Sequence, residues 1–243
     1  MTLDVLPVSI EKEIEPEDDI VGLILESQKI CNADILVIAQ KIISKKEGRL
    51  VDLSSVTPSL LAEGISSQYQ KDPRIVELIL QESKKIVRMK NGIIIVETNN
   101  GLVCANAGID ESNVRDGCAT LLPKNPDLSA DSIRKQIFDR TKKSVAVIIS
   151  DTFGRPFRLG QTNIAIGLSR INPVLDYAGT LDSYGKTLRV TAIAVADELC
   201  GAAELVMKKN DKCPVAIIRN YEFLDECSSV DYLIRPEEED LFR

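Results

Sequence analysis

The chain has 243 residues, 44% of them hydrophobic, which is enough for one large globular unit or two smaller lobes with a packed core. Its 37 acidic residues outnumber the 30 basic ones, and the net charge of −7 argues against a nucleic-acid partner. Histidine is absent, which excludes histidine-based catalysis and histidine-ligated transition metals. A metal in this protein would be held mainly by oxygen, and this favours Mg²⁺ or Mn²⁺.

The apolar runs are about as long as a β-strand, and the first residues lack a charged segment followed by an apolar one. We therefore expect a cytoplasmic protein without a membrane segment. The cysteines form no CxxC pair and mostly have apolar neighbours, so buried, reduced thiols are expected rather than disulfides. The six are Cys31, Cys104, Cys118, Cys200, Cys213 and Cys227.

The first half of the chain alternates short apolar runs with helical patterns. One apolar run leads directly into a helical segment in which Lys41 and Lys45, four residues apart, share a face. Asn99, Asn100 and Gly101 separate two β-prone runs, which predicts a hairpin. In chain order, the sequence predicts a strand over 3–10, a helix from Pro16, a strand over 34–39, helices over 58–69 and 73–89, and a hairpin over 92–105.

The second half continues this alternation without a linker or an internal repeat. It contains neither GxGxxG nor the GxxxxGK motif followed by Ser or Thr, so a nucleotide would bind without those loops. We expect an α+β fold with mixed sheets and packed helices. The predicted elements are a helix from Ser129, a strand over 145–150, a strand over 188–196, a helix over 197–209 and a strand over 214–219.

Two segments carry residues suited to binding an ion together with an anion. One apolar run ends at Asp151, and the segment after it, predicted to be a loop, carries Arg155 and Arg158; an earlier segment carries Asp110 and Asn113. Each aspartate alone also fits the role of a turn cap. Two acids and two arginines on strand-end loops, however, satisfy each other best around a shared metal or phosphate.

Two lysine pairs leave alternatives open. Lys41 and Lys45 fit a solvated helix face, but their position after a buried strand also suits phosphate contacts. Lys208 and Lys209 end a predicted helix, where basic residues complement the helix dipole or bind a terminal phosphate.

Seven strings of the chain together resemble the coenzyme F420-0:L-glutamate ligase family. The resemblance runs through essentially the whole chain, and several of the strings are long and unusual. They are LPV at 6, ISKKEGR at 43, CANAGIDESN at 104, LLPKNPDLSA at 121, SDTFGRPFRLGQTNIAIG at 150, DYAGTLDSYGKTLRVTAIAVADEL at 176 and AAELVMKK at 202.

The resemblance implies a GTP-dependent ligase of coenzyme F420 biosynthesis. Such an enzyme attaches L-glutamate to coenzyme F420-0 and then a further glutamate by γ-linkage. It further implies a single unit over 1–243, an α+β intertwined homodimer, and a site shared by GTP and two divalent cations, with K⁺ as a further ion. The implied metal ligands are Asp110, Asp151 and Thr152. The implied GTP positions are Leu6, Pro7, Val8, Ser9, Gln40, Lys41, Lys45, Asn113, Glu204, Leu205, Val206, Met207, Lys208, Lys209, Asn210 and Asp211.

The chemistry expected from this resemblance is phosphorylation of the F420-0 carboxylate by GTP, followed by displacement of phosphate by the glutamate amine. Asp151, Lys45, Arg155 and Arg158 are the expected catalytic residues, the two arginines from charge alone.

The chain also departs from the family pattern. Lys208 stands where the family usually has glycine, and Asn99 and Asn100 replace a basic pair found in many members. The alternative functions are a non-catalytic regulatory homologue that binds GTP and metal, and an amide ligase with a different acid acceptor.

Overall fold

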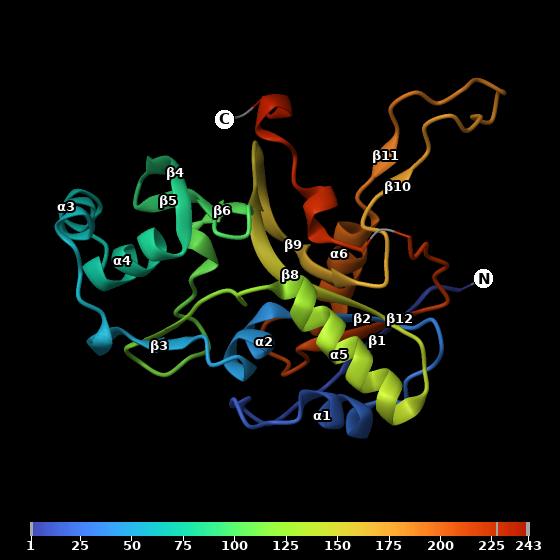
Figure 1. Ribbon diagram of the computed structural model, residues 1–243, viewed down its shortest axis with the longest axis horizontal. Helices are drawn as coiled ribbons and strands as arrows, with labels where there is room; N and C mark the ends of the chain where they lie inside the picture. The colour runs from blue at the N-terminus through green and yellow to red at the C-terminus, as the bar shows by residue number, and fades with distance from the viewer. Residues whose placement is uncertain (1, 227, 242–243) are drawn as a thin grey trace.

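The structure, a computed structural model, describes residues 2–226 and 228–241, so Cys227 lies outside the described residues. Its main body is built on a five-stranded sheet (Figure 1). β2 and β8 are parallel and the other neighbouring pairs are antiparallel, which confirms the expected mixed sheet. In spatial order the strands are β1 (Asp4–Val8), β12 (Val215–Arg219), β2 (Ile35–Ala39), β8 (Ala146–Arg155) and β9 (Arg158–Ser169).

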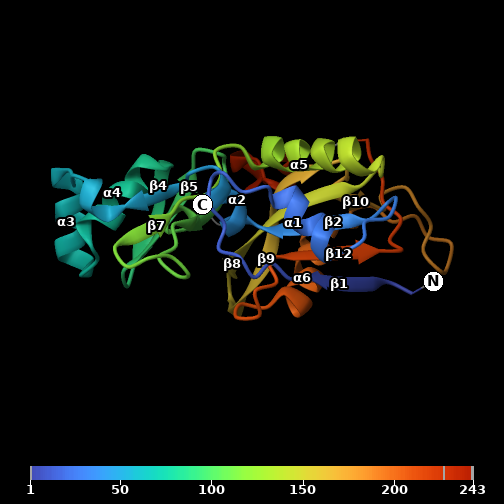
Figure 2. The same ribbon diagram turned by 90° about the horizontal axis from the view of Figure 1, so that it is seen from below.

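Helices cover both faces of this sheet, which explains why its central strands are continuously apolar. In β2, Leu36 and Ile38 belong to the core on one face, whereas Ile35 and Val37 belong to the core on the other. Figure 2 places α5 and α6 on opposite sides of the sheet. The helices of the main body are α1 (Ile20–Ser27), α2 (Gln40–Lys46), α5 (Pro126–Thr141) and α6 (Val195–Met207).

Residues 50–120, here called the side region, form a second packed part with its own apolar core. This part extends from the main body in both views (Figures 1 and 2). Its helices are α3 (Leu60–Tyr69) and α4 (Pro73–Gln81). Its strands are β4 (Ser83–Lys90), β5 (Ile93–Thr98) and β6 (Val103–Ala105) in one sheet, and β3 (Leu50–Asp52) with β7 (Cys118–Thr120) in another.

The helix predicted over 73–89 is wrong in its second half, because α4 ends at Gln81 and β4 follows. Asn91 and Gly92 both have positive φ, 51° and 76°, and connect β4 to β5 as a two-residue hairpin turn. The apolar residues after Gln81 therefore pair across a sheet rather than along a helix. The hairpin predicted over 92–105 is confirmed by the antiparallel pairing of β5 with β6.

The strand predicted over 188–196 is wrong over most of its length. Only β11 (Ala192–Ile193) is extended and paired, with β10 (Leu175–Asp176), and Val195 already begins α6. Between β10 and β11 the chain forms a long ribbon that projects from the body (Figure 1). Because the ribbon leaves the body, Val190 is exposed rather than packed in a sheet.

Side-chain caps set two helix starts that differ from the predicted ones. Asp19, rather than Pro16, precedes α1, and its carboxylate accepts a hydrogen bond from the Gly22 amide at 3.1 Å. Asn125 caps α5 through the Leu128 amide at 3.0 Å, so this helix begins before Ser129. Short 3₁₀ turns cover Leu53–Ser55, Asn106–Gly108, Val230–Leu233 and Glu237–Glu239.

None of the helices in residues 2–226 and 228–241 combines the length and the apolar composition that a bilayer span requires. The described cysteines are all free thiols.

Candidate active site

The segment that begins at Ser150 is a strand rather than the expected loop. β8 continues through Asp151 and pairs with β9 until Arg155 stands opposite Arg158. Phe157, with φ of 60°, lies in the turn between the two strands. The polar residues after Ser150 remain in the sheet because β9 provides a backbone partner for each of them.

The two arginines lie at the tip of this hairpin. Arg155 donates to the carbonyl oxygen of Leu159 at 2.7 Å, so its guanidinium serves the hairpin backbone. Both arginine side chains belong to exposed residues. Among the contacts of the described residues, none joins Arg155 or Arg158 to Asp110 or Asp151.

Asp110 lies in the side region, held by a β-bridge to Thr120. Its carboxylate accepts hydrogen bonds from the Ser112 amide at 2.7 Å and from Lys41 Nζ, on α2, at 2.7 Å. Burial opposes ionisation of Asp110, but the bonds from Lys41 and Ser112 outweigh it and hold its pKa below the usual value. Asp110 therefore both caps a local turn, as one reading of the sequence predicted, and binds a lysine of the main body.

Lys45 lies one helical turn after Lys41 and is only 8% exposed. Its ammonium donates to the carbonyl oxygen of Asn113 at 2.9 Å and forms a close ion pair with Glu13. Gln40, also buried, is fixed by the Ser44 hydroxyl at 2.8 Å. The face of α2 that carries these residues thus points at the 110–113 segment, and Lys45 is not part of a solvated surface.

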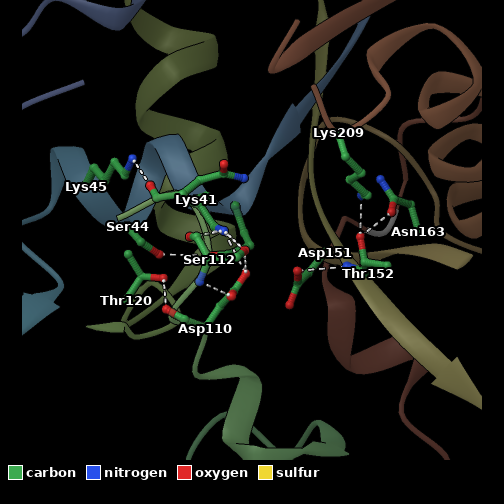
Figure 3. Close-up of polar contacts among 12 residues, drawn as sticks. Lys41, Ser44, Lys45, Asp110, Ser112, Thr120, Asp151, Thr152, Asn163 and Lys209 are labelled. Atoms are coloured by element: carbon green, nitrogen blue, oxygen red, sulfur yellow. Dashed lines mark hydrogen bonds and ion pairs between the residues drawn. The ribbon is translucent and has the colours of Figure 1, made fainter. Parts of the chain in front are cut away.

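Asp151 faces Asp110 from β8, and Figure 3 shows the two carboxylates directed toward each other. Burial raises the pKa of Asp151 to about 6; the Thr152 amide, which donates to its Oδ1 at 2.7 Å, partly opposes this, and the negative charge of Asp110 adds to it. None of the salt bridges in the described part of the chain includes Asp151. The site therefore holds two facing acids of which one has no basic partner in direct contact.

Thr152 takes part in a ring of polar contacts next to Asp151. Figure 3 shows its contacts with Asn163 and Lys209. Its hydroxyl lies 2.6 Å from Asn163 Oδ1 and accepts from Lys209 Nζ at 2.7 Å. Asn163 Nδ2 donates to Glu204 Oε2 at 2.9 Å, and Glu204 Oε1 lies 3.0 Å from Lys209 Nζ. The ring joins β8, β9, α6 and the segment after α6.

These residues fit a divalent cation held by few protein ligands. Two facing carboxylates with one elevated pKa are what a bound cation would relieve, and the Thr152 backbone amide bonds to one of them. No cluster of three or more Cys, Asp or Glu side chains in the described ranges is arranged to hold a metal. Phosphate or water oxygens would complete the shell, as is usual for Mg²⁺ in nucleotide sites.

Two segments expected to contact the nucleotide, residues 6–9 and residues 204–211, lie side by side. The Ile10 amide, just after the 6–9 segment, donates to the Lys212 carbonyl at 2.9 Å, and the Ser9 hydroxyl is 3.2 Å from Cys213 Sγ. Within the second segment, Met207 is buried in the core and Leu205 is exposed. Lys208, Lys209, Asn210 and Asp211 are exposed in the turn after α6.

Asn163, which contacts Thr152, and Glu13, which contacts Lys45, were not predicted from the sequence. Asn163 lies in the string that starts at Ser150, within the alternating pattern of β9. This pattern was the signal in the sequence that could have identified it. Glu13 lies in an acidic segment with no distinguishing pattern of its own.

Comparison with known proteins finds relatives that match most of the chain. The family model described as F420-0:Gamma-glutamyl ligase matches residues 10–220. A curated coenzyme F420:L-glutamate ligase of Methanothermobacter thermautotrophicus is 46% identical over 234 residues, 93% of each protein. The protein of that name from Methanocaldococcus jannaschii is 47% identical over 213 residues, 87% of this chain and 85% of the relative. That from Methanosarcina mazei is 38% identical over 232 residues, 95% and 91% respectively. With most of its length matched in this way, the chain belongs to the F420-0:gamma-glutamyl ligase family.

Proposed function

We propose that this protein joins L-glutamate to coenzyme F420-0 at the expense of GTP, in coenzyme F420 biosynthesis, and adds a further glutamate by γ-linkage. The observation that carries the proposal is the pair Asp110 and Asp151, which face each other from different parts of the fold. Lys41 bonds to Asp110 and Lys45 to the Asn113 carbonyl, and both would supply positive charge for a phosphate chain. The names of the curated relatives supply the substrates of the proposal.

The proposed chemistry has two steps. In the first, an oxygen of the F420-0 carboxylate bonds to the γ-phosphorus of GTP, the bond to the β–γ bridging oxygen breaks, and GDP leaves. In the second, the glutamate amine bonds to the acyl carbon, inorganic phosphate leaves, and the nitrogen loses a proton. Positioning and charge neutralisation are the protein's main contributions to both steps.

Asp110, Asp151 and Thr152 would hold two divalent cations, Mg²⁺ or Mn²⁺, which supply charge neutralisation at the phosphate oxygens. Lys45, buried and anchored on the Asn113 carbonyl, would orient the transferred phosphate. Arg155 and Arg158 would contact the substrate only after a rearrangement of the hairpin tip. K⁺ is part of the same proposal as a monovalent ion.

The GTP contacts proposed for residues 6–9 and 204–211 draw support from the contact between the ends of these segments. Gln40 and Asn113 would complete the nucleotide site near the two lysines. We propose further that residues 1–243 act as a single ligase unit whose site lies between the main body and the side region.

The proposed homodimer draws support from the ribbon between β10 and β11. Leu181, Tyr184 and Val190 are 66%, 89% and 91% exposed on it. Apolar side chains on a projecting segment are typical of surfaces that pack against another chain.

Replacing Asp151 tests the site. We expect Asp151→Asn to keep the circular dichroism spectrum of the wild type and to lose GTP-dependent ligation by far more than threefold, because a ligand of the transferring phosphate's cations contributes several kcal/mol. Asp139→Asn, an exposed acid on α5, is the matched control and should keep full activity. Ligation within about threefold of wild type in Asp151→Asn would refute the metal role.

A further inference from the structure

Asn163 is a buried polar residue that lies against the proposed metal ligand Thr152. It is 4% exposed and is placed by β9 opposite Thr152 of β8. Its side-chain oxygen lies 2.6 Å from the Thr152 hydroxyl, and its side-chain nitrogen lies 2.9 Å from Glu204 Oε2. A buried amide with both ends bonded has a single satisfied orientation.

The partners decide which way each proton points. The Glu204 carboxylate only accepts hydrogen bonds, so the NH₂ group of Asn163 faces it and the amide oxygen faces Thr152. The proton of the Thr152 hydroxyl is then donated to Asn163 Oδ1. Lys209 Nζ can only donate, and it lies 2.7 Å from Thr152 Oγ1. It therefore occupies one lone pair of that oxygen, which leaves the hydroxyl proton for Asn163.

We infer that Asn163 is a positioning residue, which binds the hydroxyl proton of Thr152 so that the oxygen lone pairs face the cation site. Lys209 donates to one of these lone pairs in the structure, and a bound cation would take its place. The ammonium of Lys209 would then be free for the phosphate chain. This inference rests on the proposed metal role of Thr152, and it adds Asn163 and the order of exchange to that role.

The test uses Mn²⁺ alone, measured by the loss of the free-ion signal in electron paramagnetic resonance. Asn163→Ala should weaken Mn²⁺ binding about 10- to 100-fold, the usual effect of removing a group that orients a metal ligand. Because Asn163 acts through the Thr152 hydroxyl, the same change should have less than about a twofold effect in a Thr152→Val background, where that hydroxyl is absent. Equal effects in both backgrounds would overturn the inference.

Glu204→Gln provides a second variant if Asn163→Ala fails to fold. A glutamine presents either a donor or an acceptor to Asn163 and no longer fixes its orientation. It should weaken Mn²⁺ binding in the wild-type background more than with Thr152→Val, and equal weakening would again overturn the inference. Ser169→Ala, a buried polar position on the same strand, is the matched control and should change binding by less than about twofold.

Failure of the inference and failure of the proposed function give different results. Wild-type protein that binds no Mn²⁺ contradicts the metal site and, with it, the role of Asn163. If the wild-type protein binds Mn²⁺ and the Asn163→Ala variant binds it with the same affinity, the positioning role alone is contradicted.

Discussion

Replacing Lys208 by glycine should stabilise the protein. Lys208 has φ of 51° and ψ of −168°, close to a backbone region that is nearly restricted to glycine. Holding a residue with a side chain there costs about 1–3 kcal/mol, while a glycine costs about 0.4–1 kcal/mol through the greater freedom of the unfolded chain. The backbone gain from glycine is therefore about 1–2 kcal/mol.

Lys208→Ala is the control that isolates this gain. Both replacements remove the ion pair between Lys208 and Asp211, whose side chains are 62% and 48% exposed, so its loss cancels in the comparison. Only glycine relieves the backbone. In differential scanning calorimetry, Lys208→Gly should unfold about 2–8 °C above Lys208→Ala. An alanine variant at least as stable as the glycine variant would refute the strain argument.

Three further predictions concern stability and assembly. Arg219→Ala should destabilise the protein by about 3–5 kcal/mol in urea unfolding, because it leaves the fully buried Asp34 carboxylate without its two 2.8 Å partners; a loss below about 1 kcal/mol would contradict this. Burial alone would raise the pKa of Asp131, but hydrogen bonds from neighbouring basic side chains outweigh this and lower the pKa to about 2, below its unfolded value. Asp131 therefore stabilises the fold above about pH 4, and this stability is lost as the pH falls toward 2, so Asp131→Asn should flatten the Tm profile in that interval, whereas parallel profiles would count against it. Leu181→Asp, at an exposed ribbon position, should shift the protein from dimer to monomer in analytical ultracentrifugation, and an unchanged mass would reject the ribbon as the interface.

The buried sheet was predictable because its strands are short apolar runs with clear ends. β2 and β12 lie where the sequence predicts them. β4 was not predictable from its apolar spacing, because Ile86 and its neighbours also fit a helix, and the turn at Asn91 and Gly92 decides between the two. The ribbon was missed because its apolar residues look like those of a buried strand while they lie on the surface.

The candidate site divides in the same way. Asp110 and Asp151 stand out in the sequence as acids after apolar runs, but only the fold brings the side region against β8. Asn163 and Glu204 are 41 residues apart in the chain, and no local pattern signals their hydrogen bond. For the two arginines, the spacing in the sequence favoured a place in the site. In the structure, however, the Arg155 guanidinium bonds to the backbone of the extended β8–β9 hairpin.

Mass spectrometry of a reaction containing the purified protein, F420-0, L-glutamate, GTP and Mn²⁺ tests the proposed ligation most directly. We predict a product heavier than F420-0 by one or two glutamyl units, formed only when GTP is present. Protein that binds GTP and Mn²⁺ but leaves the mass of F420-0 unchanged and releases no phosphate would contradict the proposed ligation and identify a non-catalytic homologue. Phosphate release with another carboxylic acid, and none with F420-0, would instead identify an amide ligase with a different acceptor.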